Sequence, residues 1–104
     1  MPWKAVVPIG DLGDDEVRGV AVDGVDIAVY RTDGAYFATS NICTHSYARL
    51  CDGYLDGTII ECPLHQAEFD IKTGEVLGGP TQTPLKTYST RVRDGWVEVD
   101  ISDP

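Results

Sequence analysis

The sequence lacks long apolar runs and any recognisable export signal. None of its apolar runs approaches the ~18 residues that a membrane-spanning helix requires. The stretch that follows Met1 is short and soon reaches Asp11, unlike the apolar core of a secretory signal. A length of 104 residues accommodates one domain with one modest core. We therefore expect a single soluble, cytoplasmic domain over residues 1–104, with no membrane contact.

Basic residues are also scarce. Eight Lys and Arg stand against seventeen Asp and Glu, which gives a formal net charge of −9. Contacts to phosphate groups need clustered Lys and Arg, so nucleic acid is not an expected partner. Two interpretations of the charge stay open: it steers the protein toward basic patches on partner proteins, or it only keeps a small protein in solution.

Cysteine and histidine are few. The chain has three cysteines, and this odd number argues against a disulfide framework. It has only two histidines. A dinucleotide-binding glycine motif is absent as well, so we do not expect the chain to oxidise NAD(P)H by itself.

Helical periodicity is missing, whereas turn signals are frequent. No window repeats every 3.6 residues with caps, so we expect little or no helix. Asp-Gly occurs five times and favours tight hairpin turns. We expect hairpins that join 17–22 to 25–30, that turn at 33–34 into 35–39, and that pair 86–92 with 96–101. Short strands between such turns predict an all-β fold, an antiparallel sandwich or small barrel.

Two loops, about 41–53 and 62–66, fit no strand pattern and carry the residues able to bind metal. The first reads Cys43-Thr44-His45, and sixteen residues later the second reads Cys62-Pro63-Leu64-His65. Each loop offers one thiolate and one imidazole, so a single zinc ion and a two-iron cluster are both alternatives to metal-free loops. Common zinc motifs pair Cys with Cys and His with His. The alternation here favours two irons, because each loop can then give one ligand to each metal.

This arrangement resembles the Rieske motif, in which two histidines replace two cysteines on one iron of a [2Fe-2S] cluster. The chain is similar to the Rieske ferredoxins of bacterial aromatic-ring-hydroxylating dioxygenases, such as the naphthalene and biphenyl systems. The residues that carry the resemblance are Asn41–His45, Asp52–Leu55, Ile60–Gln66, Phe69-Asp70 and Thr73-Gly74.

The resemblance implies a Rieske fold of antiparallel sheets with a small cluster-binding subdomain. It implies one [2Fe-2S] cluster per chain, with Cys43, His45, Cys62 and His65 as both metal and cofactor ligands. It also implies a third loop, about 78–84 and rich in proline, that covers the cluster.

The same resemblance implies a soluble one-electron carrier and no catalytic residues. The carrier would act as a monomer, receiving electrons from a flavin-dependent NAD(P)H ferredoxin reductase and passing them to a terminal Rieske oxygenase. With both histidines used as cluster ligands, the chain cannot also build the mononuclear iron site of an oxygenase. A fixed redox subunit, such as the small subunit of a nitrite reductase, is the alternative, and a structural zinc module is a third class.

Overall fold

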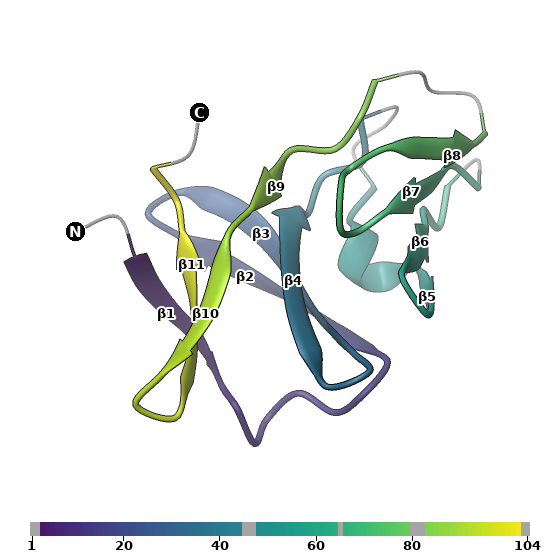
Figure 1. Cartoon of the computed structure of the whole chain (residues 1–104). Helices are drawn as coiled ribbons and strands as arrows, with labels where there is room; N and C mark the ends of the chain where they lie inside the picture. The colour runs from purple at the N-terminus through teal and green to yellow at the C-terminus, as the bar shows by residue number, and fades with distance from the viewer. Residues whose placement is uncertain (1–2, 45–47, 65, 80–82, 103–104) are drawn as a thin grey trace.

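The computed structural model describes residues 3–44, 48–64, 66–79 and 83–102, and in these ranges the protein is built almost entirely of strands (Figure 1). The strands are β1 (Trp3–Pro8), β2 (Glu16–Val22), β3 (Val25–Thr32), β4 (Ala35–Ser40), β5 (Tyr54–Asp56), β6 (Ile59–Glu61), β7 (Glu68–Asp70), β8 (Val76–Gly78), β9 (Thr87–Tyr88), β10 (Thr90–Arg93) and β11 (Trp96–Asp100). Among the described residues, one 3-10 helix, η1 (Leu50–Asp52), interrupts them. No helix in these ranges is long and apolar enough to cross a membrane.

The strands form three antiparallel sheets. The orders are β1-β11-β10, β2-β3-β4-β9 and β5-β6-β7-β8. In Figure 1 the small β5–β8 sheet stands apart at the right, beside the two larger sheets. The all-β fold with a separate small sheet is therefore confirmed.

Asp-Gly pairs make most of the hairpin turns, as predicted. At 23–24, 33–34 and 94–95 both residues have positive φ, for example 50° at Asp23 and 80° at Gly24. Two successive positive φ angles match the twist of antiparallel strands, and Asp-Gly tolerates them. The pair at 52–53 differs, because Asp52 ends η1 and Gly53 is its C-cap.

The predicted pairing of 86–92 with 96–101 is confirmed for its second half, where β10 pairs with β11, and is wrong for its first half. The segment divides at Ser89 into β9, which pairs with β4, and β10, which pairs with β11. Antiparallel pairing to two different sheets requires the chain to leave one sheet and enter the other. The residue pattern alone cannot reveal this change of partner.

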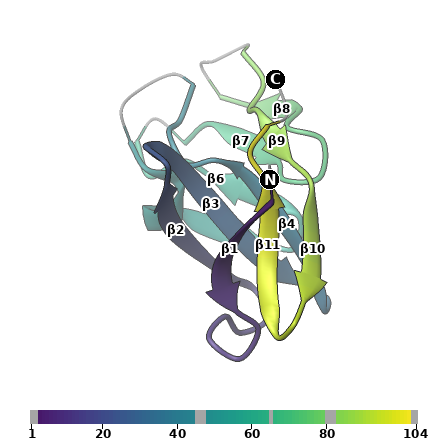
Figure 2. The same ribbon diagram turned by 90° about the vertical axis from the view of Figure 1, so that its left-hand side faces the viewer.

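Strand β3 is the centre of the molecule because both of its faces are buried. Ile27 and Val29 pack into a core with Val97 and Val99 of β11, between the two larger sheets. Figure 2 shows the β1-β11-β10 sheet in front of β2, β3 and β4. The alternate residues Ala28 and Tyr30 join a second core. That second core connects β3 to the β5–β8 sheet and contains two of the predicted ligands, Cys43 and Cys62.

Candidate metal centre

The two predicted metal loops are hairpin tips of equal length. A bridge between Ile42 and Arg49 closes the first, and the last β6–β7 pair, Glu61 with Glu68, closes the second. Six residues lie inside each closing pair, 43–48 and 62–67. Each six-residue tip begins with cysteine, ends with alanine and contains one histidine.

The first and last residues of each tip are hydrogen-bonded in the same way. The Cys43 N–H donates to the carbonyl oxygen of Ala48 at 2.9 Å, and the Cys62 N–H donates to that of Ala67 at 2.7 Å. In the second tip, Gln66 has a positive φ of 58°. The sequence already held a signal for this symmetry, because alanine stands five residues after each cysteine, but the prediction did not use it.

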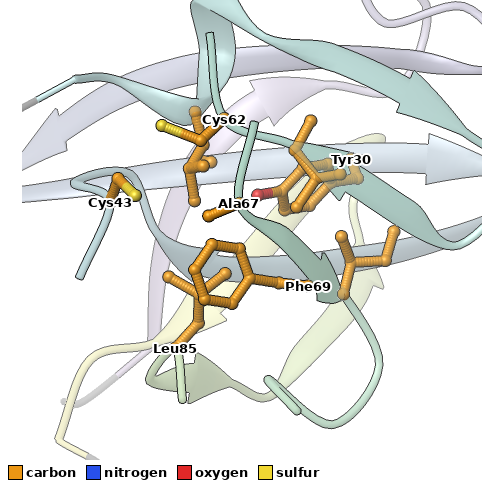
Figure 3. Close-up of a cluster of buried hydrophobic side chains, with 10 residues drawn as sticks. Tyr30, Cys43, Cys62, Ala67, Phe69 and Leu85 are labelled. Carbon is orange, nitrogen blue, oxygen red and sulfur yellow. The ribbon is translucent and has the colours of Figure 1, made fainter. Parts of the chain in front are cut away.

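Cys43 and Cys62 are suitable metal ligands. Both side chains are buried, with exposed fractions of 3% and 0%. They belong to one apolar cluster with Tyr30, Phe69 and Leu85, and Figure 3 shows both sulfur atoms at the same edge of it. A thiolate is costly to bury unless a cation neutralises it. Two soft donors at one edge of an apolar core therefore fit an iron–sulfur cluster.

The histidine half of the prediction cannot be placed in the same way. His45 and His65 lie outside the described residues. Within the described ranges, no three His, Cys, Asp or Glu side chains gather as a metal site. The assignment of the two imidazoles as ligands therefore stays a prediction.

The ends of the predicted covering loop contact both metal loops. Gly79 packs against Ala67: a Cβ atom at position 79 would lie 2.5 Å from Ala67 Cα. At the other end, the Thr44 hydroxyl donates to the Thr83 carbonyl oxygen at 2.8 Å. Residues 80–82 lie outside the described part of the chain, so coverage of the cluster stays a prediction. Neither contact was anticipated from the sequence.

Tyr30 forms part of the apolar floor behind the two cysteines. Its hydroxyl lies 2.8 Å from Thr39 Oγ1, and its side chain is completely buried. Burial raises the pKa of Tyr30 above its ordinary value, because the phenolate form would lose hydration. The floor of the site therefore stays uncharged across the physiological range.

Negative charge gathers around the candidate site. Residues 52–79 include six carboxylates and one lysine, a net charge of −5 out of the chain's −9. Five ion pairs of the described residues all lie outside this segment, for example Lys4 with Asp23 and Arg91 with Glu98. The negative charge of residues 52–79 is therefore less neutralised by ion pairs than the charge on the rest of the described residues.

Known proteins match this chain along nearly its whole length. The family model described as "Rieske [2Fe-2S] domain" matches residues 2–89. The ferredoxin component of the naphthalene 1,2-dioxygenase system of Pseudomonas putida is 43% identical over 100 residues, which is 96% of each chain.

Two solved structures match as well. Sphingomonas yanoikuyae B1 ferredoxin has a TM-score of 0.89 at 44% identity, over 97% of this chain and 98% of that one. A chain from the complex of reduced oxygenase and oxidized ferredoxin in carbazole 1,9a-dioxygenase has a TM-score of 0.92 at 36% identity. That match covers 96% of this chain and 94% of the other.

Proposed function

The chain belongs to the Rieske [2Fe-2S] family, and on this premise we propose that it is the ferredoxin component of an aromatic-ring-hydroxylating dioxygenase system. It is an electron-transfer component and not an oxygenase. Its relatives are named as ferredoxin components of naphthalene and anthranilate dioxygenase systems. Their agreement along the whole chain supports this role over that of a fixed subunit in an unrelated enzyme.

The matched hairpin tips are the observation that carries the proposal. Cys43 and Cys62 begin the two tips and would hold one iron, and His45 and His65 would hold the other. When bound, the cluster supplies one-electron redox chemistry at a potential above that of four-cysteine ferredoxins. The chain's own residues bury the thiolates, exclude water from their inner side and fix the separation of the two loops.

The partners follow from the same role. A terminal oxygenase is the electron acceptor, in keeping with the ferredoxin–oxygenase complex of the carbazole system. An NAD(P)H-dependent flavin reductase is the proposed donor, because the sequence lacks a dinucleotide-binding motif of its own. We further propose that the protein works as a soluble monomer in the cytoplasm, since a shuttle must leave one partner before it meets the next.

Metal analysis of the purified protein tests the site. We expect a red-brown protein with about two irons and two acid-labile sulfides per chain. The reduced state should show the low average g value of a cluster with mixed ligands. Cys43→Ser and Cys62→Ser should each abolish iron binding. One zinc per chain and no visible absorbance would contradict the proposal.

Reconstitution tests the role. The reductase and terminal oxygenase of a naphthalene 1,2-dioxygenase system are mixed without their own ferredoxin. Addition of this chain should restore NAD(P)H-dependent oxygenation, and the cluster-free Cys43→Ser variant should not. Permanent co-purification with a large redox enzyme, together with failure to couple the two components, would favour the fixed-subunit alternative.

A further inference from the structure

The stems below the two metal loops are supported differently. Below the second tip, β6 and β7 continue as a regular ladder beneath the Glu61–Glu68 pair. Below the first tip, the single bridge between Ile42 and Arg49 has no neighbouring pair. One arm continues into β4, and the other turns at once into η1, which begins at Leu50. The two arms of the first loop therefore lack the strand ladder that joins the arms of the second.

Asn41 connects the arms where the ladder is missing. Its backbone carbonyl oxygen accepts a hydrogen bond from the Leu50 N–H at 2.7 Å. Its side-chain Oδ1 accepts one from the Cys51 N–H at 2.9 Å. Its Nδ2 group donates to Asp26 Oδ1 at 3.1 Å and to Cys51 Sγ at 3.3 Å. One side chain thus joins β3, the start of the loop and the end of the loop.

The surroundings of Asn41 are built to keep this amide in place. The side chain is only 1% exposed, and a buried amide is tolerated only when its polar atoms are hydrogen-bonded. Gly19 of β2 leaves the necessary space, because a Cβ there would lie 2.8 Å from both Asn41 Nδ2 and Cys51 Sγ. Asp26, the acceptor, is in turn held by Arg49 at 3.7 Å.

We propose that Asn41 is the positioning residue of the first metal loop, and that it replaces the strand pairing which positions the second. The inference rests on the proposed cluster ligands. Cys43 and His45 follow Asn41 within four residues, so freedom at Asn41 displaces both at once. Each iron takes one ligand from each loop, and displacement of the first loop therefore releases the cluster as a unit.

The test is the rate at which the full-length holoprotein loses its visible absorbance in excess chelator, at a temperature well below unfolding. Asn41→Ala leaves the half-buried Cys51 N–H and Asp26 Oδ1 without the hydrogen bonds that the amide supplies, and we expect cluster loss to become about tenfold faster or more. Gly19→Ala keeps Asn41 but places a methyl group against its amide. We expect it to accelerate cluster loss too, with strand β2 intact.

Matched controls separate positioning from general stability. Gly10→Ala introduces a methyl group with no atom within 4 Å and should leave the rate unchanged. Val97→Ala opens the other core, and it should lower the unfolding temperature with little effect on cluster loss below it. Asn41→Asp combined with Asp26→Asn exchanges donor and acceptor, and it should lose its cluster more slowly than Asn41→Asp alone.

The outcomes distinguish this inference from the proposed function. Faster cluster loss in Asn41→Ala and Gly19→Ala than in their controls supports the positioning role. Rates in Gly19→Ala equal to those in Gly10→Ala overturn it, whether or not Asn41→Ala folds. A wild-type chain that binds no iron–sulfur cluster overturns the proposed function, and this inference falls with it.

Discussion

Cys51 lies within the first predicted metal loop, about 41–53, without being one of the predicted ligands. Its thiol is free and half-buried, and it accepts a hydrogen bond from Asn41. A serine hydroxyl can accept the same bond, whereas a valine methyl group cannot. At the scale of single residues, the hydrogen-bonding capacity of position 51 therefore matters more than its metal-binding capacity.

We expect Cys51→Ser to keep its full iron content and a nearly unchanged reduction potential, because the acceptor for Asn41 is retained. Cys51→Val should lose the cluster faster than Cys51→Ser, since the Asn41 amide then has one unpaired N–H. Iron analysis and voltammetry of the two variants check this prediction. Loss of the cluster in Cys51→Ser would show that the thiol is a ligand after all.

Tyr30 gives the protein a stability limit at alkaline pH. Its pKa is raised by burial, so between the ordinary tyrosine pKa, about 10, and the folded value the native state holds a proton that the unfolded state has lost. The contribution of Tyr30 to the free energy of unfolding is therefore complete below about pH 10 and falls as the pH rises further.

Tyr30→Phe should remove this alkaline loss. At neutral pH the variant should be less stable by about 1 kcal/mol, because it lacks the hydrogen bond to Thr39. Denaturant unfolding of both proteins at pH values from 7 to about 11 measures the difference. Equal falls in stability above pH 10 for the two proteins would show that Tyr30 is not the group that titrates.

At the scale of elements, Gly79 determines how the third loop meets the second metal loop. Its φ of 98° and its contact with Ala67 both disfavour a side chain. We expect Gly79→Ala to cost about 2 kcal/mol or more in the free energy of unfolding. Gly24→Ala is the control, because it has a φ of 80° but no atom within 4 Å of its Cβ.

The control should cost only about 1 kcal/mol, the penalty for a left-handed alanine. Thermal unfolding of both holoproteins gives the comparison. If the two variants are equally destabilised, the contact between Gly79 and Ala67 contributes nothing, and the third loop is attached by other means.

Elements whose signals are local could be predicted from the sequence. Asp23-Gly24, Asp33-Gly34 and Asp94-Gly95 form the expected turns because a tight turn depends on the φ preferences of its own two residues. The division of 86–92 at Ser89 could not be predicted, because it depends on which sheet lies nearby.

The candidate site shows the same difference between features that depend on neighbouring residues and features that depend on distant ones. The cysteines are predicted ligands because each shares a short loop with a histidine, and the structure places both cysteines in one core cluster. The role of Asn41 could not be seen, since its partner Asp26 is fifteen residues away on another strand.

At the scale of the whole molecule, charge is distributed unevenly. A net charge of −5 lies on residues 52–79, the segment that runs from the end of η1 through the β5–β8 sheet and carries the second metal loop. Of the two interpretations of this acidity, steering of a basic partner depends on where the charge lies, whereas solubility depends only on its total.

Two double variants distinguish these interpretations. Glu61→Gln with Glu68→Gln removes two charges that face each other across β6 and β7. Asp33→Asn with Asp94→Asn removes two charges from distant turns, where asparagine tolerates the observed φ of 54°. If the charge steers docking, only the first pair should slow electron transfer to the terminal oxygenase, by about tenfold at low salt.

Stopped-flow kinetics at several ionic strengths measures this rate. The difference between the two double variants should shrink toward 0.15 M salt, where the screening length is about 8 Å. Equal effects of both pairs at every salt concentration would leave solubility as the role of the charge.

The pairing of β1 with β11 has a consequence for how the molecule can be joined to others. Trp3 and Asp100 are register partners, so the first and last paired positions among the described residues lie side by side in the β1-β11-β10 sheet. In Figure 1 that sheet lies on the opposite side of the molecule from β5–β8. Linkers attached at the two ends of this sheet would therefore leave the molecule close together and far from the metal loops. The protein can therefore be inserted into a larger chain, or joined covalently to a redox partner, while the metal loops stay unobstructed.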